Sequence, residues 1–285
     1  MPELPEVETT KTSLLPLLNE TITAVEIRQS SLRWPIPDDL NKLVGQQLVQ
    51  LKRRSKYILA EFEHDSMLWH LGMSGSFRIC DSTEELRKHD HLILRFTDTD
   101  LRYHDPRRFG CILWLDESSQ NKLLDPLGPE PLSEAFHAEY LFEKFKNKQV
   151  GIKVAIMDNH VVVGVGNIYA TESLFNLGIH PAQPASSLTK VQIENLVIEI
   201  KRILKQAIDL GGSTLRDYTN AMGENGYFQQ TLLAYGRAGE MCINCETTLE
   251  NIKLGQRASV FCPQCQPLKK VKLAKPKIKA VQGNS

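Results

Sequence analysis

Four cysteines close together near the C-terminus constrain the fold of this chain more than any other feature. They are Cys242, Cys245, Cys262 and Cys265, and they follow the spacing C-x2-C-x16-C-x2-C. Each tight pair offers two thiolates from a single turn, as a tetrahedral four-thiolate zinc site requires. Because so short a segment cannot bury a core of its own, metal binding supplies its folding energy. We therefore predict one structural zinc ion in a small β-hairpin.

The remaining composition is that of an ordinary globular protein, with 41% apolar and 24% charged residues. Cys80 and Cys111 lie in apolar, strand-like segments, and we interpret them as small core residues. The chain has no apolar run of the roughly 20 residues that a membrane helix needs. Its start, Met-Pro-Glu-Leu-Pro-Glu, does not resemble a secretory signal, so we expect a cytoplasmic protein with no membrane partner.

The zero net charge conceals an asymmetry between the two ends of the chain. From Arg237 onward there are nine Lys or Arg residues and three acids, a net charge of +6, which leaves −6 for the rest. A basic module on a mildly acidic body is compatible with nucleic-acid binding, although a solvated tail accounts for part of the asymmetry. The final residues, 268–285, are lysine-rich and contain no acid, and we expect them to be disordered.

The first half of the chain predicts one helix followed by short strands. Residues 2–15 place Leu4, Val7 and Leu14 near one helical face, and Pro16 is expected to end or kink the helix. Beyond residue 20, short β-rich runs alternate with turns, which predicts an antiparallel sandwich. The expected strands are Ile22–Ile27, Leu48–Lys52, Tyr57–Phe62, Met67–Leu71, Leu92–Phe96 and Cys111–Leu115.

The second half predicts helices. The segment 125–131 is rich in proline and glycine and resembles a linker. Ser133 is expected to cap a helix running to about Asn147, and further helices are expected over 151–158 and from Asn167. Thr189 and Gln192 form a capping box for a long amphipathic helix to about Leu210. Residues 211–236 are glycine-rich and irregular, and the cysteine module follows.

Pro2 is the sharpest candidate for chemistry. Loss of Met1 leaves a proline with a free secondary amine, and an α-amino group titrates near roughly 7.7–8.0. Such an amine can attack a sugar C1′ and form an iminium, and the adjacent Glu3 can donate or accept the proton. Proline in the first helical turn is also an ordinary helix starter, and the residues alone do not decide between these interpretations.

A series of ordered motifs resembles the bacterial formamidopyrimidine-DNA glycosylases. The chain opens Met1-Pro2-Glu3-Leu4-Pro5-Glu6-Val7-Glu8-Thr9, and the likeness continues to the zinc module, from residue 2 to about 266. The other matching segments are His70–Gly75, Lys88–His91, Asp105–Gly110, Gly164–Tyr169 and Gly211–Asp217.

The resemblance implies an α+β fold of four parts. These are an N-terminal helix with an antiparallel β-sandwich (1–125), a helix–two-turns–helix domain (132–236), a zinc finger (237–267) and the basic tail (268–285). It implies a monomer that binds damaged double-stranded DNA. The implied reaction is excision of oxidised purines, 8-oxoguanine and formamidopyrimidines, followed by β,δ-elimination.

The resemblance also assigns residues to the reaction and to DNA. Pro2 is the expected Schiff-base nucleophile and Glu3 the acid that assists base departure. Lys56 assists β-elimination, and Arg257 grips phosphate and assists δ-elimination. The matching DNA-contacting positions are His70, Met73, His89, Arg107, Phe109, Lys148 and Asn167.

Physical arguments support some of these roles and leave alternatives for others. A glycosylase must extrude its target, and Met73, Arg107 and Phe109 match the wedge that fills the vacated stack. Met73 taken alone also fits a core residue, and Lys148 also fits a solvated helix end. His89, like His91, has the alternative of a structural histidine.

Two departures and two rival functions complete the interpretation. The chain continues past the last cysteine pair further than the family usually does, and Met222 stands in the lesion-capping loop where we expect a polar residue. The nearest rival is an endonuclease VIII-like glycosylase for oxidised pyrimidines, but Leu4 and the Arg107–Phe109 segment favour the purine enzymes. The second rival is a non-catalytic DNA-binding homologue, against which Pro2, Glu3 and Lys56 argue.

Overall fold

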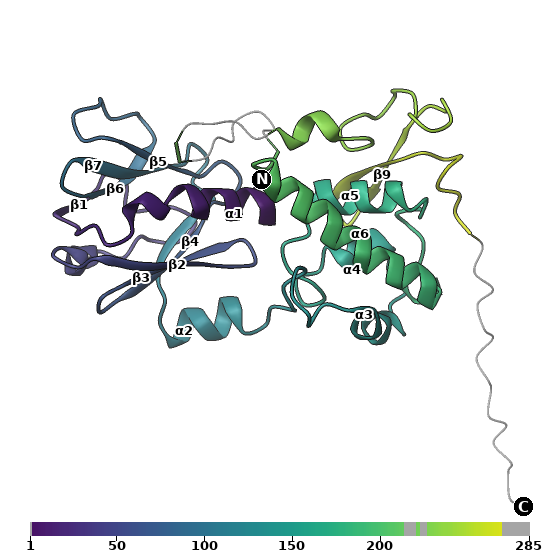
Figure 1. Cartoon of the computed structure of the whole chain (residues 1–285), viewed down its shortest axis with the longest axis horizontal. Helices are drawn as coiled ribbons and strands as arrows, with labels where there is room; N and C mark the ends of the chain where they lie inside the picture. The colour runs from purple at the N-terminus through teal and green to yellow at the C-terminus, as the bar shows by residue number, and fades with distance from the viewer. Residues whose placement is uncertain (1, 214–220, 223–226, 270–285) are drawn as a thin grey trace, which may run out of the picture.

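The computed structural model describes residues 2–213, 221–222 and 227–269. Two lobes lie side by side, one built of strands and one of helices (Figure 1). Helix α1 (Leu4–Ser13) runs along the strand lobe, with its amino end at the junction between the lobes. The expected α+β class is confirmed, and the junction is where both lobes can contribute side chains to one site.

Two four-stranded antiparallel sheets form the first lobe. One has the order β1-β6-β7-β5 and the other β2-β3-β4-β8. The strands are β1 (Ala24–Ile27), β2 (Leu48–Arg54), β3 (Tyr57–Phe62), β4 (Ser66–His70), β5 (Ser76–Asp81), β6 (Asp90–Arg95), β7 (Thr99–His104) and β8 (Cys111–Trp114). The expected sandwich is therefore present, and six of its strands lie where the alternation of apolar residues indicated.

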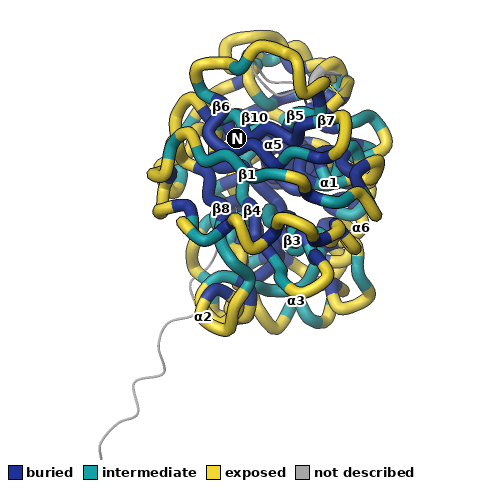
Figure 2. The backbone as a smooth tube through the Cα atoms, turned by 90° about the vertical axis from the view of Figure 1, so that its left-hand side faces the viewer, coloured by how far each residue is buried: buried dark blue, intermediate teal, exposed yellow. Residues whose placement is uncertain are grey.

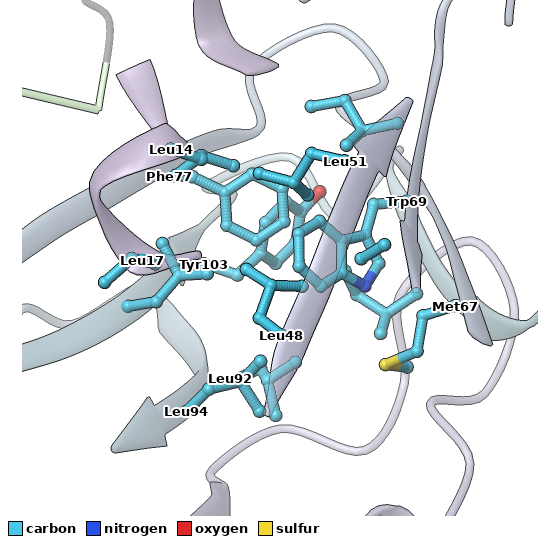
Figure 3. Packing of buried hydrophobic residues seen from close by; sticks show 14 of the residues in the cluster. Leu14, Leu17, Leu48, Leu51, Met67, Trp69, Phe77, Leu92, Leu94 and Tyr103 are labelled. Atoms are coloured by element: carbon cyan, nitrogen blue, oxygen red, sulfur yellow. The ribbon is translucent and has the colours of Figure 1, made fainter. Parts of the chain in front are cut away.

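The two sheets share one apolar core. The rings of Trp69 and Phe77 lie 4.8 Å apart between centroids, and Phe77 lies 5.1 Å from Tyr103, joining strands of both sheets. Leu14 and Leu17, from α1 and the 3₁₀ turn η1 (Leu15–Leu17), cover this core, as Figure 3 shows. Burial of these side chains fixes α1 against the sandwich.

Strands β5 and β7 were missed by the sequence prediction. Strand β7 begins at Thr99, directly after Asp98, in a stretch whose polar residues gave no strand signal. Asp100 and Arg102 are both buried in β7 and form an ion pair at 2.9 Å, so charged residues occupy positions in the interior of the lobe. A pattern based on apolar alternation does not register such a strand.

The outer face of the second sheet is covered by a short helical segment that was not expected. Helix α2 (Glu117–Ser119) continues into the π-helical turn η3 (Gln120–Leu124), and Leu124 packs against Leu68 and Cys111. The short 3₁₀ turn η2 (Leu40–Leu43) lies between β1 and β2. Both Cys80 and Cys111 are buried, as expected of core residues.

The described residues of the second lobe form four α-helices and their short connections. They are α3 (Ala138–Phe145), α4 (Ile152–Ile156), α5 (Asn167–Asn176) and α6 (Lys190–Asp209), with 3₁₀ turns η4 (Ala185–Ser187) and η5 (Phe228–Thr231). The capping box of Thr189 and Gln192 is confirmed, and the predicted face of α6 is buried. The predicted start at Ser133 is wrong, because His137 caps α3 by accepting from the Tyr140 N–H at 3.3 Å.

The cysteine module is the predicted hairpin. Strands β9 (Glu250–Leu254) and β10 (Arg257–Phe261) pair antiparallel, and Cys242 and Cys262 are buried with Leu249 and Phe175 of α5. Figure 2 shows the buried backbone, including α5, enclosed by exposed loops. The hairpin thus rests on the helical lobe through α5.

Candidate active site

The start of α1 is tied to the start of α5. The Glu3 N–H donates to Glu6 Oε2 at 2.8 Å, which caps α1, and the Leu4 N–H donates to the Gly164 carbonyl at 3.2 Å. Pro2 precedes the cap and is buried. The helix begins at Leu4, so Pro2 lies just outside it rather than in its first turn. These contacts fix the N-terminal residues at the junction of the lobes.

Glu3 is a buried carboxyl group that faces the amino end of α5. Its Oε1 accepts from the Ile168 N–H at 3.0 Å, and its Oε2 has no hydrogen-bond partner among the described residues. Burial raises the pKa of Glu3, while the nearby Lys56 opposes that shift. A Cβ at Gly166 would lie 2.1 Å from Glu3 Cδ, so only glycine allows this approach. The raised pKa favours the protonated form of this acid at the junction.

Lys56 lies in the two-residue turn between β2 and β3. Ser55 adopts φ 55° there, and its N–H donates to Glu130 Oε1 at 2.7 Å. Burial lowers the pKa of Lys56, and the charge of Arg257 acts in the same direction, whereas Glu3 and Glu6 raise it. A lowered pKa increases the share of neutral lysine, which is the form that can accept a proton.

These side chains meet at one cavity of about 300 Å³. The α1 cap, the β2–β3 turn, the helical lobe and the zinc hairpin all contribute to its walls. Its lining residues are Glu3, Lys56, Met73, Met157, Asn159, Val165, Gly166, Asn167, Ile168, Tyr235 and Arg257. Five of the residues predicted for the site, Glu3, Lys56, Met73, Asn167 and Arg257, are therefore brought together.

Arg257 reaches the cavity because its strand is anchored nearby. The buried Lys153 of α4 donates to the Ala258 carbonyl and to Ser259 Oγ, both at 2.9 Å. Burial lowers the pKa of Lys153 to about 8. Lys153 therefore joins the hairpin to the helical lobe one residue from Arg257.

His70 lies at the end of β4, beside this site. Its Nδ1 accepts from the Gly72 N–H at 3.0 Å. Burial lowers the pKa of His70 to about 4, assisted by the positive charges of Lys56 and Arg33. The ring is therefore neutral near pH 7, and with Nδ1 accepting, the proton resides on Nε2. Nε2–H is then free to donate to an anionic oxygen.

A buried aspartate organises the predicted wedge. Asp105 accepts from Ser74 Oγ at 2.6 Å and from the Gly110 N–H at 2.9 Å, which joins the Met73 loop to the 106–110 loop. Met73 is 38% exposed and Phe109 45%, so neither is an ordinary core residue. The Arg107 guanidinium carbon lies 4.8 Å from the Phe109 ring centroid. The three wedge side chains therefore project from one braced pair of loops.

His89 and Lys148 do not line the cavity. The His89 ring lies against His91 and His104, at centroid distances of 6.0 and 5.8 Å, beside a separate hollow of about 340 Å³. His91 is buried, and its Nε2 lies 2.8 Å from the Asp105 carbonyl, which fits the structural alternative. Lys148 donates to Asp158 Oδ2 at 2.8 Å, so its ammonium group is already paired.

The zinc ligands are arranged as a tetrahedral metal requires. The four Sγ atoms lie within 4.8 Å of one another, with separations such as 3.5 Å for Cys245 and Cys262 and 3.9 Å for Cys242 and Cys265. Zn–S bonds of about 2.3 Å in a tetrahedron place sulfurs about 3.8 Å apart. One structural zinc ion therefore fits these residues.

Two buried carboxylates that shape the site were missed. Glu6 accepts from the Tyr169 hydroxyl at 2.6 Å and from the Ser213 N–H at 2.8 Å. Glu172 of α5 accepts from three consecutive backbone N–H groups, of which the Tyr235 N–H is the nearest at 2.7 Å. The signal for Glu172 was that it is the one charged residue of α5 (Asn167–Asn176). The predicted lesion-capping loop lies mostly outside the described residues, although Met222 is described and exposed.

None of the helices in the described segments has the length and apolar character required to cross a membrane.

Three family models match this arrangement part by part. The formamidopyrimidine-DNA glycosylase N-terminal domain matches residues 1–112, and the H2TH domain of the same enzymes matches residues 127–219. The zinc finger found in FPG and IleRS matches residues 239–268. Together with the cavity, these matches define a class: zinc-finger DNA glycosylases with an H2TH domain.

Relatives and solved structures agree with this class. Formamidopyrimidine-DNA glycosylases of Acinetobacter baumannii and Acinetobacter baylyi are 79% and 80% identical, covering 95% of this chain and 99% and 100% of theirs. Lactococcus lactis Fpg bound to DNA with an abasic site is 35% identical, with a TM-score of 0.86 over 93% of this chain and 99% of that one. The wild-type L. lactis enzyme bound to DNA with N7-benzyl-Fapy-dG has a TM-score of 0.86 at 34% identity, covering 93% and 100%. The chain belongs to the formamidopyrimidine-DNA glycosylase family.

Proposed function

We propose that this protein excises oxidised purines, 8-oxoguanine and formamidopyrimidines, from damaged duplex DNA through a Schiff base at Pro2 and then cleaves the strand. It is a DNA glycosylase, and abasic-site lyase activity is typical of its family. The single observation that carries the mechanism is the cavity that gathers Glu3, Lys56 and Arg257 next to Pro2.

The first step transfers the sugar from the base to the enzyme. The Pro2 amine, freed by loss of Met1, forms a bond to C1′ while the glycosidic C–N bond breaks. The departing base takes the bonding electrons and a proton, which Glu3 supplies; burial raises the pKa of Glu3 and so favours its proton-donating form. Opening of the sugar ring leaves an iminium between Pro2 and C1′.

The second stage breaks the DNA strand on both sides of the sugar. Removal of a C2′ proton from the iminium expels the 3′ phosphate, and Lys56 assists this β-elimination because its lowered pKa makes a neutral amine accessible. A further elimination expels the 5′ phosphate, whose charge Arg257 stabilises across the cavity. Zinc takes no part in these steps; when bound, it holds the hairpin that carries Arg257.

The remaining predicted residues position the DNA. His70 Nε2–H and Asn167, at the first turn of α5, are placed to donate to phosphate oxygens. Met73 and Phe109 fill the vacated stack, and Arg107 hydrogen-bonds the base left behind. We also propose phosphate contacts for His89 and Lys148, the latter after exchanging Asp158 for DNA.

The decisive experiment is borohydride trapping on duplexes with 8-oxoguanine or an abasic site. We expect a covalent adduct with both. Glu3→Gln should suppress trapping and incision of the 8-oxoguanine duplex far more than of the abasic duplex, because an abasic site has no base to expel. Glu139→Gln, an exposed acid on α3, serves as the matched control. Equal losses on both duplexes would contradict the role of Glu3.

We further propose a cytoplasmic monomer associated with the nucleoid, with the parts 1–125, 132–236, 237–267 and 268–285. Separate apolar clusters in the sandwich, the helical lobe and the hairpin support these boundaries. Ala221 is an exception, because it packs into the sandwich core and its carbonyl accepts from the Ile79 N–H at 2.9 Å. Light scattering and limited proteolysis test the monomer and the boundaries.

A further inference from the structure

An exposed arginine–tryptophan pair lies in the loop between β1 and η2. The loop closes on itself through the Ile36 N–H, which donates to the Ser30 carbonyl at 2.8 Å, and the buried Leu32 anchors it in the core. Between these anchors, Arg33 and Trp34 are both exposed, and the Arg33 guanidinium carbon lies 4.8 Å from the Trp34 ring centroid. The Trp34 ring is 37% exposed, so one side of it is available to the Arg33 guanidinium on a braced loop.

The pair adjoins the elements that face DNA in the proposed function. The Arg33 N–H donates to the carbonyl of Gly110, the last residue of the wedge loop, at 3.2 Å. Its charge also acts on His70 and Cys111, where β4 and β8 pair beside the cavity. Arg33 therefore lies beside the wedge loop and near His70, which is expected to contact a phosphate.

The chemistry of the pair suits a phosphate. Within the described part of the chain, the Arg33 side chain makes no hydrogen bond or ion pair. Its guanidinium group instead makes a cation–π contact with the Trp34 ring. Stacking on an aromatic ring restrains the guanidinium plane and leaves its N–H groups free. A guanidinium held in this way can bind a phosphate through two parallel hydrogen bonds without losing much further entropy.

We propose that Arg33, stacked on Trp34, binds a backbone phosphate of the DNA next to the wedge, as a contact additional to those around the cavity. The proposal rests on the proposed function, since it requires DNA on this face. It assigns to Trp34 the role of a positioning residue, which acts through Arg33. It also accounts for the short, anchored loop, because a phosphate contact needs a fixed register relative to the wedge.

The test measures equilibrium binding to a duplex containing a tetrahydrofuran abasic analogue and to an undamaged duplex over a range of salt. One lost phosphate contact lowers the slope of log K against log salt by about 0.9. We expect this change, with a loss of roughly tenfold in affinity at moderate salt, for Arg33→Ala on both duplexes alike. Arg33→Lys should keep the salt slope but lose part of the DNA affinity, because lysine retains the charge without the planar guanidinium that forms two parallel hydrogen bonds.

Three comparisons make the result decisive. Trp34→Ala should weaken binding and Trp34→Phe should restore it, because only the stacking surface is needed. Lys205→Ala removes one exposed charge from α6 and should leave the slope unchanged. Zinc content and melting temperature verify folding. An unchanged slope for Arg33→Ala, or an equal change for Lys205→Ala, would overturn the inference.

The proposed function has a separate readout. If the wild-type protein forms the borohydride adduct while Arg33→Ala keeps the wild-type slope, only the phosphate contact fails. If the wild-type protein forms no adduct, the failure concerns the proposed function itself.

Discussion

The sandwich lobe and the zinc hairpin contribute opposite walls of one cavity, but they are held together by different forces. The sandwich buries Trp69, Phe77 and Tyr103 between two sheets, so apolar burial alone can sustain it. The hairpin has two five-residue strands and a small cluster built around its own cysteines. The comparison teaches that one wall of the site depends on a metal ion and the other does not.

The largest effect is expected on the sandwich side, at Pro2. Pro2→Gly, or retention of Met1, should abolish the trapped adduct, because Met1 turns the nucleophilic amine into an amide. Zinc content should not change, since the hairpin is a separate unit. Trapping on an abasic duplex and mass spectrometry of the N-terminus check this. Undiminished trapping by a protein that retains Met1 would refute the mechanism.

The next effect is expected on the hairpin side. Cys245→Ser should release zinc and sharply reduce DNA affinity, because Arg257 loses its support. The sandwich should stay folded, as near-ultraviolet dichroism of its aromatic core would show. Cys80→Ser, a buried cysteine of the sandwich, is the matched control and should retain zinc. A zinc-free protein with full DNA affinity would show that the hairpin wall of the cavity does not depend on the metal ion.

A smaller effect is expected at the wedge, which belongs to the sandwich side. Arg107→Ala should flatten discrimination between lesions opposite cytosine and opposite adenine, since a good base contact is worth about 1–3 kcal/mol. Arg107→Lys retains the charge without the planar fork and should recover affinity more than discrimination. Single-turnover excision from the two duplexes measures this. Unchanged discrimination would leave Arg107 with a phosphate or structural role.

The basic tail extends the hairpin side beyond the described residues. Truncation after Pro267 removes six lysines. If all six met phosphates the salt slope would fall by about five; we expect about half of them to do so, and hence a change of about two or three. Lesion choice and trapping should not change. A full-length protein with the six lysines replaced by glutamine is the control, and coincident salt plots would show that the tail contributes nothing.

The smallest effect is a pH dependence of stability in the sandwich lobe. Burial lowers the pKa of His70 to about 4, so the unfolded state binds this proton more tightly. The free energy of unfolding should therefore fall as pH drops from 6.5 towards 4. His70→Gln should flatten this part of the curve relative to wild type, as denaturant unfolding at several pH values would show. If the free energy of unfolding of the variant fell with pH as steeply as that of the wild type, His70 would be excluded as the cause of the pH dependence.

The sequence predicted the elements whose apolar periodicity is regular and missed those with buried polar pairs. Helix α6 and its capping box were found, whereas β7 was hidden by Asp100 and Arg102. The convergence of Glu3, Lys56 and Arg257 came from motif resemblance, because no spacing rule relates residues so far apart in the chain. Asp105, Lys153 and Glu172 were not assigned roles, because their partners are backbone groups or side chains that only the fold brings near.

The contact between Glu3 and Ile168 has an electrostatic consequence. It joins the N-cap of α1 to the first turn of α5, so that the amino ends of these two ten-residue helices converge at the cavity. Each such end carries a partial positive charge of roughly one half. Their potentials add at this point, which favours the phosphates of a DNA strand there. One convergence of dipoles therefore lies beside the nucleophile proposed at Pro2, at the point where a phosphate backbone is electrostatically favoured.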